Sequence, residues 1–114
     1  MPNRPQRNNN PGNLKFAGQR EAVGRDDAGH AVFPTPWAGW RALLAQLRLD
    51  QRRGLTVRQW IYRYAPPGEN RTEDYLRYLC AELNCSTLTL LADLSAFALA
   101  GVVANYEGYF AKEG

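Results

Sequence analysis

Residues 88–110 read LTLLADLSAFALAGVVANYEGYF and include the longest apolar run of the 114-residue chain, from 97 to 104. Apolar side chains recur at roughly helical spacing over residues 88–106, and Ala and Gly occupy many of the other positions. A helix that is apolar on most sides belongs in the interior of a protein. We therefore predict a buried helix over residues 88–106 that contacts the other helices, with a hairpin beside its C-terminal end.

The last turn of this predicted helix carries a single acid, Glu107, followed by Gly108. Gly suits the left-handed residue that ends a helix. A carboxylate at this end faces the negative pole of the helix, which costs about 0.3–1 kcal/mol when it is exposed. Two interpretations follow for Glu107: a solvated terminal residue, or a general acid whose pKa is raised by apolar and aromatic neighbours so that it can protonate a glycosidic oxygen.

Three further helices and one hairpin are predicted ahead of this segment. A helix over 35–53 begins with a Thr cap and a Pro at its first position. A helix over 56–65 begins with a capping-box pattern, and one over 72–84 begins with a Thr cap and ends at Asn. Short alternating runs at 13–16 and 30–33 predict a small antiparallel hairpin. Together these elements predict a mainly helical α+β domain.

Residues 1–12 contain three prolines and four asparagines, which favours an extended arm ahead of a single domain over 13–114. The N-terminus is polar where a signal peptide needs an apolar core, and the longest apolar run is far shorter than the ~20 residues of a membrane span. We therefore expect no signal peptide and no membrane insertion.

The net charge and the number of His and Cys residues limit which partners and cofactors the chain is expected to bind. The net charge of +3 suits an anionic polymer such as cell wall, whereas basic residues spread along the chain give little support to nucleic-acid binding. One His and two cysteines, Cys80 and Cys85, do not make a metal constellation. No metal and no organic cofactor is expected.

Three motifs resemble a family of small bacteriophage virion proteins. They are RNNNPGNL at 7–14, AVFPTP at 31–36, and YAPP, EN and T-x-x-Y between 64 and 75. That family in turn resembles the lysozyme superfamily, including lytic transglycosylases, in circularly permuted order. The hairpin comes first here, and residues 107–110 resemble the end of the catalytic helix moved to the C-terminus. Such a permutation leaves the packed elements unchanged when the termini lie close together.

The resemblance implies a lysozyme-like domain that cuts the β-1,4 glycan of peptidoglycan as a muramidase or lytic transglycosylase. Glu107 would be the general acid, and Tyr75 would orient it. Glu21 is the first candidate for a second carboxylate, followed by Asp26 and Asp27, because the hairpin loop is expected to overhang the cleft. Hydrolysis becomes possible when a second carboxylate lies about 5–9 Å from the first.

Sugar rings stack on exposed aromatic side chains, which predicts a substrate-binding groove beside the acid. The residues expected to bind substrate are Asn13, Trp37, Trp40, Tyr64, Asn70 and Tyr109. The alternative is a non-catalytic virion protein with the same fold, whose groove or N-terminal arm binds capsid or tail partners. In either case the expected location is the virion or the host cytoplasm.

Overall fold

The computed structural model describes residues 1–112, and over them the fold is mainly helical α+β, as predicted. Five α-helices, one 3-10 helix and a two-stranded antiparallel sheet make up the described chain. Their order is α1 Arg4–Arg7, β1 Gly24–Arg25, β2 Ala31–Val32, α2 Pro36–Gln51, α3 Val57–Tyr64, α4 Thr72–Leu83, the 3-10 helix η1 Leu91–Asp93 and α5 Ala96–Tyr106.

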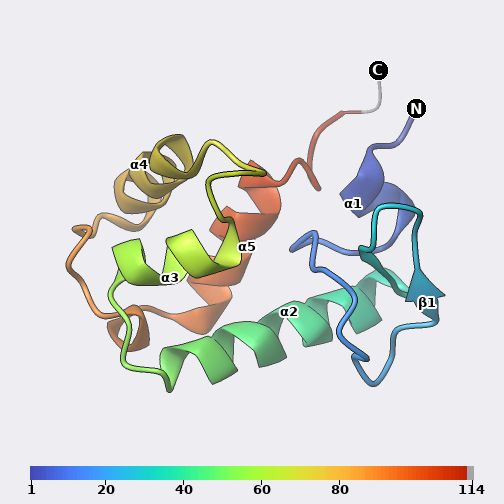
Figure 1. The fold of residues 1–114 in the computed structure, drawn as a ribbon, viewed down its shortest axis with the longest axis horizontal. Coiled ribbons are helices and arrows are strands. Elements are labelled where there is room, and N and C mark those ends of the chain that lie inside the picture. The colour runs from blue at the N-terminus through green and yellow to red at the C-terminus, as the bar shows by residue number, and fades with distance from the viewer. Residues whose placement is uncertain (113–114) are drawn as a thin grey trace.

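The long helix α2 spans the molecule, and the other elements lie beside its two ends (Figure 1). Helix α1 and the sheet lie at its N-terminal end, while α3, α4 and α5 gather toward its C-terminal half. Helix α5 packs against α2 and α4, and α3 packs against α4. No helix within residues 1–112 has the length and apolar character needed to cross a membrane.

The starts of α2 and α3 confirm the predicted caps. The Thr35 hydroxyl accepts a hydrogen bond from the Ala38 N–H at 3.2 Å, and Thr56 and Gln59 form a capping box. The predicted cap of α4 is wrong by one residue. Arg71 is the N-cap, and Thr72 instead donates its hydroxyl to the Ala65 carbonyl at 2.5 Å, which ties the start of α4 to the end of α3.

The last helix begins at Ala96, eight residues later than predicted. Ser95 is its N-cap, with its hydroxyl accepting a hydrogen bond from the Ala98 N–H at 3.2 Å. The preceding residues form a turn, a single bridge at Leu90 and η1, and carbonyls of the turn accept hydrogen bonds from the start of α3. The Thr89 carbonyl accepts from the Val57 N–H at 2.8 Å, so this stretch completes the first turn of another helix.

Helix α5 buries one face rather than most of its surface. The buried residues of α5 are Leu99, Ala100, Val103 and Ala104. Phe97, which the helical spacing placed inside, is 67% exposed, and Leu94 is half-buried just before the helix. Leu91 is fully buried as expected, but it lies in η1. The buried positions 99, 100, 103 and 104 therefore form a different face of the helix from the one that the spacing predicted.

Residues 1–12 do not form an extended arm. Residues 4–7 are helical with Asn3 as the cap, and Pro5, Asn8 and Asn10 are buried. The backbone of this segment passes so close to α2 that a Cβ added to Gly39 would stand 1.9 Å from the Asn9 carbonyl oxygen. The segment is therefore packed against the domain that was predicted to begin at residue 13.

The sheet differs in part from the predicted hairpin. Strand β2 pairs with β1, whereas the predicted first strand at 13–16 reaches β2 through a single bridge between Lys15 and His30. The Ala31 N–H donates to the Leu14 carbonyl at 2.9 Å on that side. Both predicted runs are thus neighbours, and the residues between them add a third extended segment.

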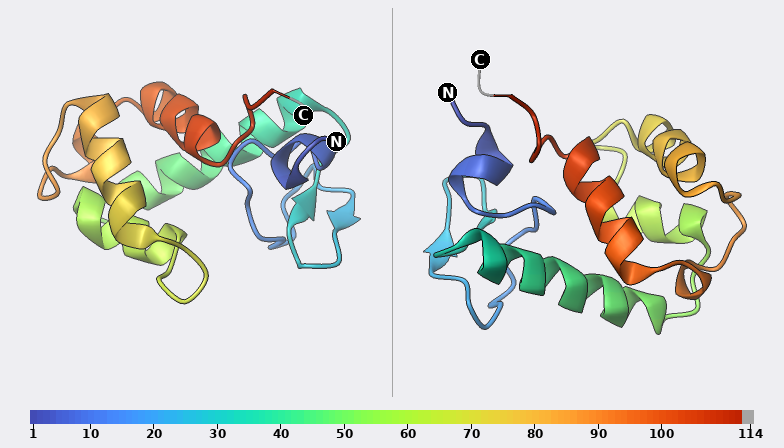
Figure 2. Two further views of the ribbon diagram at one scale, coloured as in Figure 1. Left: turned by 90° about the horizontal axis from the view of Figure 1, so that it is seen from above. Right: turned by 180° about the vertical axis from the view of Figure 1, so that it is seen from behind.

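The two ends of the chain lie side by side (Figure 2). The Gln6 amide donates to the carbonyls of Tyr109 at 3.1 Å and Ala111 at 2.7 Å. The Asn3 amide donates to the Gly108 carbonyl at 2.8 Å. It is therefore the N-terminal segment, more than the sheet, that packs beside the C-terminal end of α5.

Candidate functional site

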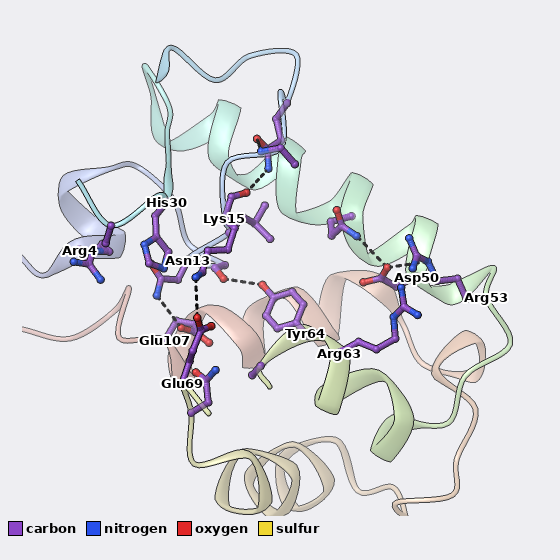
Figure 3. Close-up of a pocket in the computed structure, with 18 residues that line it drawn as sticks. Arg4, Asn13, Lys15, His30, Asp50, Arg53, Arg63, Tyr64, Glu69 and Glu107 are labelled. Carbon is purple, nitrogen blue, oxygen red and sulfur yellow. Dashed lines mark hydrogen bonds and ion pairs between the residues drawn. The ribbon is translucent and has the colours of Figure 1, made fainter. Parts of the chain in front are cut away.

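A cleft of ≈ 640 Å³ opens between the N-terminal segment, the C-terminal half of α2 and the end of α3 (Figure 3). Glu107, at the C-terminal end of α5, forms part of the cleft wall. Its polar and charged lining includes Arg4, Asn13, Lys15, His30, Asp50, Arg53, Arg63, Tyr64, Glu69, Asn70 and Glu107. The cleft therefore draws its side chains from segments at both ends of the sequence.

Glu107 is the C-cap residue of α5 and is half-buried in the wall of this cleft. Its carboxylate accepts a hydrogen bond from the Asn13 amide at 3.3 Å. Burial raises the pKa of Glu107, and the Tyr75 hydroxyl and the Asn13 amide offset only part of this effect. Gly108 follows with φ +93°, the left-handed conformation predicted for it. A half-buried acid of this kind retains its proton to higher pH than an exposed one.

Tyr75 is buried in α4 behind Glu107 and stacks on Tyr106 with ring centroids 3.8 Å apart. Its hydroxyl forms no hydrogen bond of standard geometry within residues 1–112, yet Tyr75 and Glu107 each shift the pKa of the other. Tyr75 lies where it can orient the acid, as expected, but it is covered by other residues and does not line the cleft.

Tyr64 lies between the two acids Glu107 and Asp50, and burial together with both carboxylates raises its pKa well above the usual value. Its hydroxyl donates to the Gly12 carbonyl at 2.7 Å, and its ring packs on Trp60 with centroids 4.8 Å apart. These contacts fix the ring in the cleft, where it can support a sugar.

Two further carboxylates line the cleft, and neither was predicted. Asp50 is buried and accepts hydrogen bonds from the indole N–H of Trp60 at 2.9 Å and the Gln46 amide at 3.0 Å. Glu69 is exposed and pairs with Lys15 at 3.4 Å. Because Asp50 also lies 3.4 Å from Arg53, Glu107 is the one lining carboxylate without an ion pair among the described residues.

Glu21 does not reach the cleft, contrary to the prediction for a second carboxylate. It pairs with Arg41 of α2, with hydrogen bonds of 2.6 and 2.7 Å, and these bonds lower its pKa. It lines a separate hollow along α2. A carboxylate held ionised by an arginine outside the cleft cannot act on a substrate beside Glu107.

Asp26 and Asp27, the other candidates for the second carboxylate, also lie outside the cleft lining. Burial acts to raise the pKa of Asp26, but hydrogen bonds from Asn8 and two backbone N–H groups, with the nearby charge of Arg4, hold it far below its usual range. Asp26 pairs with Arg4 at 3.0 Å and is therefore a structural anion. Asp27 is exposed.

Of the residues expected to bind sugar, Asn13, Tyr64 and Asn70 line the cleft and three aromatics do not. Trp37 is 73% exposed at the start of α2. Trp40 packs against Tyr109, with centroids 5.7 Å apart, and against Phe110 at 6.1 Å. Trp40, Tyr109 and Phe110 thus form an aromatic cluster outside the cleft, because the segment after α5 folds back over the start of α2.

Four buried side-chain atoms around the cleft form no hydrogen bond within the described chain: Arg4 Nε, which lies in an ion pair with Asp26, Asn13 Oδ1, His30 Nδ1 and the Tyr75 hydroxyl. Each such atom costs about 1–3 kcal/mol when buried, and a cluster of them is a common mark of a functional site. His30 lines the cleft, and burial together with the charge of Arg4 lowers its pKa, so it is largely neutral at pH 7. Because His30 is the single His of the chain, its residue type was a signal from which a place in the site could have been predicted.

No group of three His, Cys, Asp or Glu side chains within residues 1–112 is arranged to hold a metal ion. Cys80 and Cys85 are half-buried free thiols. Comparison of the chain with models of protein families finds no match, and comparison with curated proteins finds no similar sequence. The function is therefore inferred from the chemistry of the cleft. Its lining offers the carboxyl group of Glu107, the aromatic ring of Tyr64 and several cationic side chains.

Proposed function

We propose that this protein cleaves the β-1,4 glycan of bacterial peptidoglycan, with Glu107 as the general acid. The observation that carries the proposal is the state of this carboxyl group. It faces a cleft, it is half-buried, its pKa is raised by burial, and no cation among the described residues pairs with it. A carboxylic acid that keeps its proton to higher pH than an exposed glutamic acid is suited to protonate the oxygen of a leaving sugar.

The cleft favours lytic transglycosylation over hydrolysis. Hydrolysing glycosidases use a second free carboxylate as base or nucleophile, whereas Asp50 is held by Trp60 and Gln46 and Glu69 pairs with Lys15. A hydroxyl of the substrate sugar can take that role. As the bond from the anomeric carbon to the bridging oxygen breaks, that oxygen takes the proton of Glu107. The sugar's own hydroxyl oxygen then bonds to the anomeric carbon and returns its proton to the Glu107 carboxylate.

The remaining lining of the cleft suits an anionic glycan. The ring of Tyr64 offers an apolar surface for a sugar, and Asn70 offers a polar edge. The Arg63 side chain, near the end of α3, makes no hydrogen bond or ion pair with another described residue, so its charge is available to carboxylates of the peptide-bearing sugars. The net charge of +3 acts in the same direction over longer range.

The order of the elements also supports this proposal. The resemblance to a permuted lysozyme-like domain implies an early hairpin, an acid at the end of the last helix and termini that lie close together. Hydrogen bonds from Asn3 to Gly108 and from Gln6 to Tyr109 hold the N-terminal segment beside the residues that follow α5, which fits this expectation. On the same resemblance, the protein would act from a phage virion or from the host cytoplasm on the wall.

The test is turnover of purified peptidoglycan, with mass analysis of the released fragments. We expect fragments that end in an internally cyclised sugar, and Glu107→Gln should lower the rate by roughly 10²–10⁴-fold, the usual contribution of general acid catalysis. Glu82→Gln, on the exposed face of α4, is the matched control and should retain full activity. Undiminished turnover in Glu107→Gln would exclude this glutamate as the acid.

The second candidate is a non-catalytic virion protein that binds other virion components. Its expected binding element, a free N-terminal arm, is packed against this chain's own fold, with Asn10 fully buried. What remains for it is the groove, together with exposed aromatic side chains such as Trp37 and Phe110, which are 73% and 57% exposed. Wild-type protein that leaves peptidoglycan intact under all conditions would favour this function instead.

A further inference from the structure

We propose that Asn13 is the positioning residue of this site: its amide holds the Glu107 carboxyl in place beside the cleft, and the loop around it is built to hold Asn13. The catalytic part of this inference rests on the proposed function of Glu107. The contact joins residues 94 positions apart in sequence, and it is the one hydrogen bond of standard geometry that the described chain gives to this carboxylate. Figure 3 shows the Asn13 side chain reaching toward Glu107.

The backbone on both sides of Asn13 is held by side chains. Asn10 is fully buried, and its amide donates to the Leu14 carbonyl at 3.0 Å and the Ala31 carbonyl at 2.9 Å, while its oxygen accepts from the Leu14 N–H at 2.9 Å. On the other side, the Tyr64 hydroxyl donates to the Gly12 carbonyl at 2.7 Å. Because residues 12 and 14 are fixed in this way, the direction of the Asn13 side chain is fixed as well.

The backbone conformation of Asn13 indicates that the side chain, and not only the turn of the backbone, is needed at this position. Its φ is +51°, in the left-handed region that glycine adopts without cost and that Asn tolerates better than most residues. A loop that served only to turn the chain would be satisfied by glycine at this position. Asn adds an amide that reaches Glu107 from this conformation.

An N–H donated to a carboxylate favours its ionised form, so the Asn13 amide acts against the burial of Glu107. Tyr75 is the titratable group that acts on Glu107, and burial, helped by the Glu107 charge, raises the pKa of Tyr64, Tyr75 and Tyr106 above the usual phenol value. These tyrosines are therefore neutral where Glu107 titrates. Removing the Asn13 side chain leaves burial less opposed, so the pKa of Glu107 should rise.

The test is Asn13→Gly, which removes the amide and keeps the left-handed backbone free of strain. Asn84→Gly is the matched control, because Asn84 has φ +49° at the exposed end of α4 and does not line the cleft. The Glu107 side-chain carboxyl is followed by ¹³C NMR during a pH titration, with Glu107→Gln identifying its signal. We expect the pKa of Glu107 to rise in Asn13→Gly and to stay unchanged in Asn84→Gly.

Turnover gives the second readout. We expect Asn13→Gly to lower kcat by roughly 10–100-fold, the scale of a displaced catalytic group, while the alkaline limb of the pH–rate profile moves to higher pH. A merely structural role would lower thermal stability without moving that limb. If Asn13→Gly does not fold, Asn13→Asp keeps the shape of the side chain and replaces the donor with a carboxylate, which should raise the pKa of Glu107 further.

The two proposals fail separately. An unchanged titration of Glu107 in a folded Asn13 variant overturns the positioning role, whatever the activity. If the wild type shows no turnover while the titration shifts as expected, the proposed catalytic function is wrong and the coupling of Asn13 to Glu107 stands.

Discussion

Residues 1–34 and the helices that follow them are stabilised in different ways. The helical part surrounds a continuous apolar core whose fully buried members include Leu43, Leu47, Ile61, Leu79, Leu91, Leu99 and Val103. The N-terminal part has a much smaller apolar cluster around Ala31 and Phe33, and side-chain amides of Asn8, Asn9 and Asn10 bridge its backbone and its charges.

This difference explains where the candidate site lies. Apolar packing fixes the axes of helices but does little to direct a single polar group, whereas hydrogen bonds are directional and act over about 3 Å. Glu107 comes from the apolar part and Asn13 from the amide-held part, and they meet at the junction. Mutations in the two parts should therefore have different consequences.

The largest expected effect is in the apolar part. Leu99→Ala removes a fully buried side chain from α5 and should lower the free energy of unfolding by about 2–5 kcal/mol. Phe97→Ala, two residues earlier and 67% exposed, should cost less than about 1 kcal/mol, including its contact with Arg48. Chemical denaturation of the two variants measures the difference. Equal losses would mean that α5 does not present the face described above.

A smaller effect is expected in the amide-held part. Asn10→Ala removes the side-chain partner of the Leu14 N–H and of the Ala31 carbonyl, while the Leu14 carbonyl keeps its bond from the Ala31 N–H, and the change should cost about 1–3 kcal/mol. Amide hydrogen exchange should quicken at Leu14 and Ala31 before it changes in α5. Uniform loss of protection across the chain would contradict the division of the molecule into two differently stabilised parts.

The smallest effect concerns Glu107 and depends on pH. Because its pKa is raised above the ordinary 4.5, folding favours the protonated form, so its stabilising contribution is complete below that value and is lost as the pH rises through the folded pKa. Glu107→Gln should therefore match the wild type in Tm at acid pH and exceed it slightly near neutral pH. Thermal melts of both proteins over pH 4–8 measure this gap, and a gap that widens toward acid would refute the burial argument.

Local signals in the sequence predicted much of the helical part. The Thr caps at 35 and 56 and the left-handed Asn84 depend on neighbours within a few residues, so the pattern was sufficient. The predicted start of α5 was wrong because the backbone of residues 87–91 bonds to the start of α3, some 30 positions away, and forms a turn and a bridge there instead of a helix. Ser95, a strong N-cap type, was the signal that would have corrected it.

Part of the candidate site was predictable, because Glu107, Asn13, Tyr64 and Asn70 all line the cleft. Glu107 was identified by its place at the end of an apolar helix, whereas the pairing of Glu21 with Arg41 and of Asp50 with Trp60 joins residues on different elements. The burial of Asn10 was also hidden, because a run of Asn beside Pro and Gly resembles a mobile arm. Its partners Leu14 and Ala31 are fixed only once β2 is in place.

The bonds from Asn3 and Gln6 to the backbone just after Glu107 bear on how the protein is prepared for experiment. Residues 108–111 are anchored by the first six residues, so trimming the N-terminus by a few positions would release the chain directly behind the acid. An affinity tag on the N-terminus would emerge from this same corner of the molecule. Activity measured on tagged or N-terminally clipped protein would then report the state of that corner as much as the chemistry of Glu107.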